Sequence, residues 1–131
     1  MSAPKPFAPT EIQRRLRRLQ AAQRRQRLDA LLVTDEINRF YFTGLATSNG
    51  VLLSERCAPP AFYTDFRYLT MARRAAPWLP AHLLWRPALE PEVVAGLGRG
   101  WRRVGYEGSM PASRFLKLQA ALPEVEWVNA T

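Results

Sequence analysis

The apolar residues near the start of the chain follow the period of an α-helix. Three of them lie three or four positions apart and form a narrow stripe, while arginines occupy the other faces: Ile12, Leu16 and Leu19. Thr10 and Gln13 have the spacing of a capping box, in which the two side chains satisfy free amides of the first turn. The pattern predicts an amphipathic surface helix over 10–27. Residues 1–9 contain three prolines, and we expect them to form a disordered leader.

The pattern then changes to that of buried strands. Residues 29–34 are almost wholly apolar, as in a strand that is covered on both faces. The polar residues 35–38 mark the end of this strand. The aromatic residues 40–42 lead to Gly44, where glycine permits a sharp change of backbone direction. We therefore interpret the segment from 35 to 44 as a connection.

Short strands and helices alternate through the rest of the chain. Strands over 51–54 and 61–64, joined by a loop with two prolines, are typical of a hairpin. The remaining predicted elements are a helix capped by Asp65, a strand, a helix, a strand, a helix and a last strand: 67–76, 82–85, 91–97, 104–107, 111–122 and 126–129. This order predicts a single α/β domain with a mixed sheet of about six strands.

The positive charge is confined to one part of the 131-residue chain. The 19 Lys and Arg outnumber the 11 Asp and Glu, which gives a formal charge of +8. Residues 1–27 hold eight cations and one anion, whereas residues 28–131 hold 11 cations and 10 anions. An Arg-rich helix can bind nucleic acid, but the sequence contains no helix-turn-helix and no aromatic RNA-binding sheet. We therefore favour a solvated helix face over a nucleic-acid site.

Several classes of protein are excluded by the sequence. A single Cys and a single His cannot provide an intrachain disulfide or a four-ligand zinc site. No apolar run is long enough to span a membrane, and the proline-rich start does not resemble a signal peptide. The sequence contains no nucleotide-binding glycine motif and no carboxylate spacing that would gather metal ligands. A cytoplasmic location is therefore expected.

Five short motifs follow one another in a fixed order along the chain. They are residues 15–19, 29–34, the run from Asn38 to Gly44 with Ser48 and Gly50, residues 64–68 with Ala72, and residues 104–107. Each is short, but together, in this order and at this spacing, they resemble the N-terminal domain of the creatinase/prolidase/Xaa-Pro aminopeptidase family. The resemblance extends from about residue 10 to the end of the chain.

This resemblance implies a fold and a division of labour. The fold is a mixed-sheet α/β unit with a ribonuclease H-like motif, here over residues 10–131. In this family a following pita-bread domain binds two divalent metals, commonly Mn, and cleaves Xaa-Pro bonds. That domain lies outside this chain, so we expect the chain to be inactive alone. The resemblance also implies a homodimer, proline-containing peptides as substrates, and a role for this domain in dimerisation and in one wall of the substrate cleft.

Two loops are expected to face that cleft, 44–50 and 65–68. Within them the candidate substrate-binding residues are Ser48, Asn49, Asp65, Arg67 and Tyr68. Arg67 is the strongest candidate, because a guanidinium can hold a substrate carboxylate or carbonyl with paired donors. A salt bridge from Arg67 to Asp65 or Glu107 that orders the turn is the alternative. Asp65 is favoured as a helix cap over a direct role.

The other residues of the motifs are interpreted as structural. We expect Asn38 to bind local backbone, Tyr41 and Tyr68 to lie in the core with bonded hydroxyl groups, and Gly44 to meet a backbone requirement. Gly50 and Glu107 complete this set. Phe66 stands where relatives often carry glycine, so we expect either a tighter turn or an aromatic ring presented to the cleft.

Three functions remain open on the sequence alone. The first is the N-terminal domain of a Xaa-Pro peptidase, whose aminopeptidase, dipeptidase or creatinase type this domain does not decide. The second is part of a catalytically inactive relative that acts as a protein-binding or nucleic-acid-binding module. The third is a domain that binds nucleic acid by itself through the Arg-rich helix.

Overall fold

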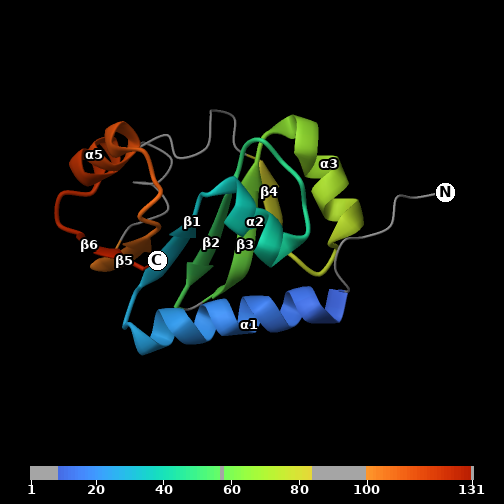
Figure 1. Cartoon of the computed structure of the whole chain (residues 1–131), viewed down its shortest axis with the longest axis horizontal. Helices are drawn as coiled ribbons and strands as arrows, with labels where there is room; N and C mark the ends of the chain where they lie inside the picture. Colours follow the sequence, from blue (N-terminus) through green and yellow to red (C-terminus); the bar gives the residue numbers. More distant parts are fainter. Residues whose placement is uncertain (1–8, 57, 84–99, 131) are drawn as a thin grey trace.

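The computed structural model describes residues 9–56, 58–83 and 100–130 (Figure 1). Its helices are α1 (Pro9–Arg25), α2 (Glu36–Thr43), α3 (Phe66–Ala75) and α5 (Ala112–Ala121). Its strands are β1 (Ala30–Val33), β2 (Val51–Glu55), β3 (Ala58–Thr64), β4 (Ala81–Leu83), β5 (Arg103–Tyr106) and β6 (Glu126–Asn129). The α/β class and the mixed sheet are therefore confirmed.

The strands form one sheet in the order β4-β3-β2-β1-β5-β6. β2 is antiparallel to both of its neighbours, β1 and β3. The other pairings are parallel, including that of β1 with β5, where Ala30 is opposite Val104. All four residues of β1 are buried, as expected for a strand covered on both faces.

The two faces of the sheet carry separate apolar cores. On one face, residues of α1 and α3 pack with Leu31, Val33 and Phe62, and Phe42 of α2 joins them. On the other face, Leu118 of α5 packs with Leu32 and other sheet residues. Figure 1 shows α1 running along the sheet, with α3 and α5 towards opposite ends of the molecule. Within the described part of the chain, no helix is both long and apolar enough to cross a membrane.

The main correction to the predicted elements is α2, because the segment interpreted as a connection is a helix of eight residues. Asp35 caps it, accepting hydrogen bonds from the N–H groups of Ile37 at 2.9 Å and Asn38 at 3.2 Å. Gly44 ends it in the left-handed conformation, with φ of 71°. Both end signals are in the sequence, but the contiguous aromatic residues between them hide the helical period.

Smaller corrections concern the ends of elements. α1 begins at Pro9, which had been assigned to the leader, so Thr10 lies within the first turn and is not the cap. β3 is longer than predicted and contains Pro59 and Pro60, next to an irregularity in its pairing with β2. The predicted helix at 91–97 and residues 1–8 of the leader lie outside the described residues.

Glu107, directly after β5, fixes the start of α2. Its carboxylate accepts hydrogen bonds from the backbone N–H groups of Thr34 at 2.5 Å and Asp35 at 2.9 Å. It also accepts a hydrogen bond from the side-chain amide of Asn38. Because these donors belong to the end of β1 and the first turn of α2, one buried carboxylate joins the end of β5 to two neighbouring elements that are 69 to 73 positions away in the sequence.

Replacing Glu107 with alanine should destabilise the domain. Two backbone N–H groups would lose their acceptor, which costs about 2–3 kcal/mol. The measurement is the free energy of unfolding in urea. Glu126→Ala is the control, because Glu126 is 63% exposed in an ion pair with Arg103, and its loss should cost less than about 1 kcal/mol. Equal effects of the two substitutions would contradict the anchoring role of Glu107.

Candidate functional site

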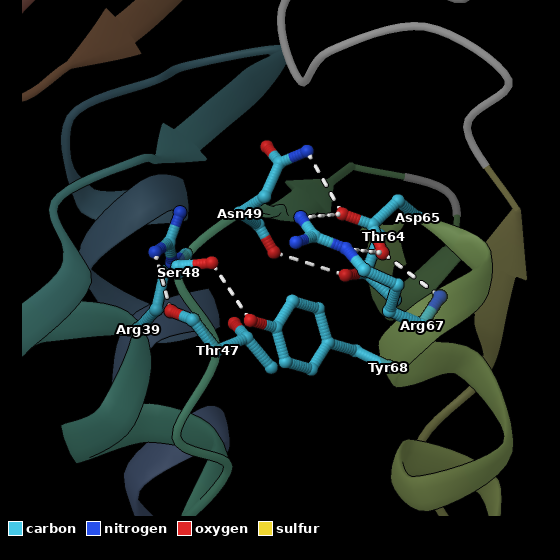
Figure 2. A network of polar contacts seen from close by, with 8 residues as sticks. All are labelled: Arg39, Thr47, Ser48, Asn49, Thr64, Asp65, Arg67 and Tyr68. Atoms are coloured by element: carbon cyan, nitrogen blue, oxygen red, sulfur yellow. Dashed lines mark hydrogen bonds and ion pairs between the residues drawn. The ribbon is translucent and has the colours of Figure 1, made fainter.

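The two predicted loops meet at one end of the sheet, where β1 and β3 end and β2 begins (Figure 2). Loop 44–50 approaches this end from α2, and the turn at 65–68 leads from β3 into α3. The structure brings all five candidate residues of these loops into one polar cluster: Ser48, Asn49, Asp65, Arg67 and Tyr68. We call this set the loop cluster.

Three hydrogen bonds hold loop 44–50 against β3 and α3. The hydroxyl groups of Ser48 and Tyr68 are 2.7 Å apart. The Asn49 side-chain amide donates to Asp65 Oδ2 at 3.2 Å, and the Thr64 hydroxyl donates to the Asn49 carbonyl at 2.9 Å. Hydrogen bonds with Ser48 also lower the pKa of the Tyr68 phenol. The loop is therefore fixed to its neighbours through the Ser48 hydroxyl and through both the side chain and the carbonyl of Asn49.

Asp65 has two structural roles in the turn. Its Oδ1 accepts a hydrogen bond from the Arg67 backbone N–H at 2.9 Å, which caps α3 as expected. The Arg67 side chain also donates to Asp65, from Nε to Oδ1 at 3.2 Å and from Nη2 to Oδ2 at 2.8 Å. The hydrogen bond from the Arg67 side chain is the main reason why the pKa of Asp65 is lowered, against the opposing effect of burial.

The ion pair orients the Arg67 guanidinium and leaves part of it free. The partner is Asp65, one of the two expected alternatives, and Glu107 is committed elsewhere. The Arg67 side chain is 58% exposed and that of Asp65 is 14% exposed. The guanidinium uses Nε and Nη2 for Asp65 and lies 5.2 Å from the centre of the Tyr68 ring. Its Nη1 group makes no hydrogen bond within residues 9–56, 58–83 and 100–130, so it can donate to another acceptor.

Arg39, a residue of α2 that was not among the predicted site residues, holds loop 44–50 in place. Its side chain is buried and donates from Nη1 to the Gly50 carbonyl at 2.5 Å and from Nη2 to the Thr47 carbonyl at 3.0 Å. Burial lowers the pKa of Arg39, while nearby carboxylates, Glu36 first, oppose this effect. The only signal in the sequence was an arginine inside an aromatic run, in a chain that contains many arginines.

Phe66 is the most exposed residue of the turn, at 77%. It is the first residue of α3 and follows the cap residue Asp65 directly. Of the two alternatives expected for this position, the structure therefore favours an aromatic side chain that is presented to solvent next to the loop cluster.

Two of the residues interpreted as structural behave differently from the prediction. Asn38 does not bind local backbone through its side chain, but donates to the distant Glu107. Tyr41 is not in the core: it is exposed, and the Arg15 guanidinium lies 4.0 Å from the centre of its ring. Both differences follow from α2, which turns these positions towards β5 and α1. Tyr68 is half-buried and has the bonded hydroxyl that was expected.

The two loop glycines meet backbone requirements, as was expected explicitly for Gly44. Gly50 has φ of 151°, and a Cβ atom there would lie 2.8 Å from Cζ of Phe62. The left-handed Gly44 and the tight Gly50 thus delimit the loop that carries Ser48 and Asn49. A side chain at position 50 would displace the loop from the core.

No group of three or more His, Cys, Asp and Glu side chains that could hold a metal ion occurs among residues 9–56, 58–83 and 100–130. The carboxylates near the loop cluster are occupied by hydrogen-bond donors: Asp65 by Arg67 and Asn49, and Glu107 by the start of α2. These residues do not fit a metal centre, and no metal-dependent step is assigned to them.

The sequence of residues 15–131 matches the Creatinase/Prolidase N-terminal domain. The chain belongs to this family. The match covers β1, both loops of the loop cluster and the Glu107 anchor. The motifs that carried the resemblance therefore correspond to the parts of the fold that position these loops. Among curated proteins, none matches the sequence.

Solved structures of this domain family have the same fold. The N-terminal domain of the cytoplasmic peptidase PepQ from Mycobacterium tuberculosis H37Rv is 30% identical, with a TM-score of 0.77 over 90% of this chain and 93% of that chain. Aminopeptidase P from Streptococcus thermophilus is 23% identical, with a TM-score of 0.81 and 92% of each chain covered. The Xaa-Pro dipeptidase from Bacillus anthracis is 23% identical, with a TM-score of 0.76 over 90% of this chain but only 33% of that chain.

Replacing Arg39 with lysine should loosen loop 44–50. An ammonium group cannot donate to two carbonyls as a planar guanidinium does, so one carbonyl loses its donor, at a cost of about 1–3 kcal/mol. Hydrogen exchange of the loop amides should accelerate more than that of β1. The control is Arg73→Lys, because the Arg73 side chain donates to the Ala81 carbonyl at 3.2 Å. Unchanged exchange in the loop would contradict the support by Arg39.

Replacing Asp65 with asparagine should lower stability at neutral pH and have less effect in acid. Because the folded-state pKa of Asp65 is lowered, its charge contributes stability above the unfolded pKa of about 3.9, and this contribution is lost as the pH falls through the folded pKa. Asparagine retains the cap but lacks the charge. Thermal unfolding of both proteins between about pH 7 and pH 2 measures the difference, with the exposed Glu124→Gln as control. A constant difference across this range would contradict the role of the charge.

Proposed function

We propose that this chain is the non-catalytic N-terminal domain of a metal-dependent Xaa-Pro peptidase, and that the loop cluster forms one wall of its substrate cleft. Membership of the Creatinase/Prolidase N-terminal domain family supports this proposal. Similar structures include an aminopeptidase P and a Xaa-Pro dipeptidase, and the dipeptidase chain is about three times as long as the segment matched here.

The observation that supports the proposal most directly is the Nη1 group of Arg67, which is not used in the ion pair with Asp65. Asp65 orients the guanidinium, and Nη1 remains available on an exposed side chain. Since Asp65 neutralises most of the charge, Arg67 offers directed hydrogen bonds and little long-range attraction. Such a group suits a carbonyl or carboxylate oxygen of a peptide that is already held in the cleft.

The hydrogen bonds of loop 44–50 make this arrangement ready to bind. Ser48 and Asn49 are held by Tyr68 and Asp65 before any peptide arrives. Binding therefore does not have to order the loop, which reduces its entropic cost. Phe66 adds an exposed apolar surface beside Arg67 that can contact a side chain of the peptide.

Bond cleavage is assigned to the second domain of the parent protein. Two divalent metals bound there, proposed to be Mn, would supply an activated water for hydrolysis. This chain alone is proposed to be inactive. Its proposed partners are its own catalytic domain, a second subunit in a homodimer and proline-containing peptides, in the cytoplasm. The preferred length of the peptide substrate would distinguish an aminopeptidase from a dipeptidase.

Replacing Arg67 with glutamine in the longest native polypeptide that contains this segment should raise the KM for Xaa-Pro peptides roughly tenfold or more, because a charged donor to the peptide is lost. The activity of both proteins is measured with and without Mn on Xaa-Pro dipeptides and on longer Xaa-Pro peptides. Arg74→Gln, also on α3 and exposed, is the matched control and should leave KM unchanged.

The outcomes separate the alternatives. Metal-dependent cleavage by the native polypeptide, with an unchanged KM in Arg67→Gln, would limit Arg67 to ordering the turn. No cleavage by a folded, metal-loaded polypeptide would favour an inactive relative that acts as a binding module. The preferred peptide length would distinguish a dipeptidase from an aminopeptidase. The 131-residue chain alone is expected to show no cleavage.

A further inference from the structure

A groove of about 630 Å³ lies between α1, α2 and the β1 side of the sheet, outside the loop cluster. Its apolar lining includes Leu19 and Ala22 of α1, Leu31 and Val33 of β1, and Phe42 of α2. These residues belong to or adjoin the core on that face of the sheet. The groove is therefore a place where this core is open to a further apolar element.

Two features define the floor and the rim of this groove. At Gly105 of β5, a Cβ atom would lie 2.7 Å from the side chains of Leu28 and Leu31, so Leu31, which lines the floor, packs directly on the backbone of the strand. At the rim of the groove, Ile37 of α2 is 78% exposed, the largest exposed fraction among the exposed large apolar side chains of the described residues. A buried floor and an exposed apolar rim are typical of a docking surface.

The charges around the groove select the occupant. Arg18, on the α1 side, is exposed and has no ion pair within the described part of the chain. The carboxylates on the opposite side, Asp35 and Glu107, are occupied by N–H donors of α2 and by Asn38. Among the described residues that line the groove, Arg18 is thus a cation without an ion pair beside an apolar floor, which fits an amphipathic segment with an acidic residue at its edge.

The path of the chain indicates where this segment comes from. Ala130, the residue after β6, forms part of the groove wall. Its N–H donates to the Tyr106 carbonyl at 2.8 Å, which holds the backbone beside β5 at this point. A polypeptide that continues from β6 therefore leaves the sheet at the groove.

We propose that the groove holds the segment that follows β6 in the longer parent chain, with apolar side chains on Leu19, Leu31 and Phe42 and an acidic residue opposite Arg18. This inference rests on the proposed function only in that the parent has a second domain. α2 lines the groove through Phe42 and Ile37, and it contacts loop 44–50, which carries Ser48 and Asn49 of the loop cluster, through Arg39. The docked segment would thus fix the second domain relative to the loop cluster.

The test uses the 131-residue chain and a synthetic peptide with the sequence that follows residue 131 in the parent. Peptide affinity is measured by titration with NMR detection. Ile37→Ser and Arg18→Glu should each weaken binding about tenfold or more. The matched controls are Leu116→Ser, which changes an exposed apolar residue on α5, and Arg24→Glu, which changes an exposed arginine of α1 outside the groove. Both should leave the affinity unchanged.

A second readout does not depend on a free peptide adopting its docked form. Because Ile37 is exposed in this chain, Ile37→Ser should leave the thermal stability of the 131-residue chain unchanged but lower that of the parent. Equal effects on both proteins, or none on either, would overturn the proposal. Dimerisation of the 131-residue chain that Ile37→Ser abolishes would assign the groove to a second copy and also overturn it. Loss or retention of peptidase activity in Arg67→Gln affects none of these outcomes.

Discussion

The geometry of the loop cluster depends on a buried guanidinium. Arg39 is almost fully removed from solvent, which is costly for a charged group unless its donors are satisfied. Its Nη1 and Nη2 groups donate to two carbonyls of one loop, those of Gly50 and Thr47, and carboxylates at the start of α2 and directly after β5 lie nearby. The loop cannot move away from α2 without leaving this charge without acceptors. Ser48 and Asn49, which lie between the two carbonyls, are thereby held where Tyr68 and Asp65 can reach them.

The short helix α2 can position loop 44–50 because it is fixed at both ends. Glu107 binds its first turn to the end of β5, and the left-handed Gly44 releases the chain into the loop. An isolated helix of eight residues has little stability in water. Here the cap at Asp35, the carboxylate of Glu107 and the packing of Phe42 supply what local propensity does not. Through α2, the long-range contact with Glu107 thus determines where loop 44–50 begins.

Most of the fold could be predicted because its signals are local. The apolar run of β1, the cap at Asp65 and the turn at Gly44 depend on neighbouring residues. The partner of Asn38 could not be predicted, since Glu107 is 69 positions away in the sequence. The position of Tyr41 was predicted wrongly because α2 was not predicted. Without this helix, nothing indicated that Tyr41 would face Arg15. The candidate site was found through the family motifs. The support from Arg39 was not, because burial of a charge is a property of the folded structure and not of the local sequence.

The pairing of β1 with β5 has a consequence for how the domain folds. β1 to β4 and the helices around them join segments that are close in sequence, so their contacts close short loops. The pairing of Ala30 with Val104 joins residues that are far apart in the sequence, and the contacts of Glu107 and α5 with the sheet likewise join the end of the chain to β1 and its neighbours. The entropy of closing so long a loop must be lost before the contacts compensate for it. The last third of the domain is therefore expected to join late, with formation of the Glu107 anchor completing α2 and the loop cluster in the same step.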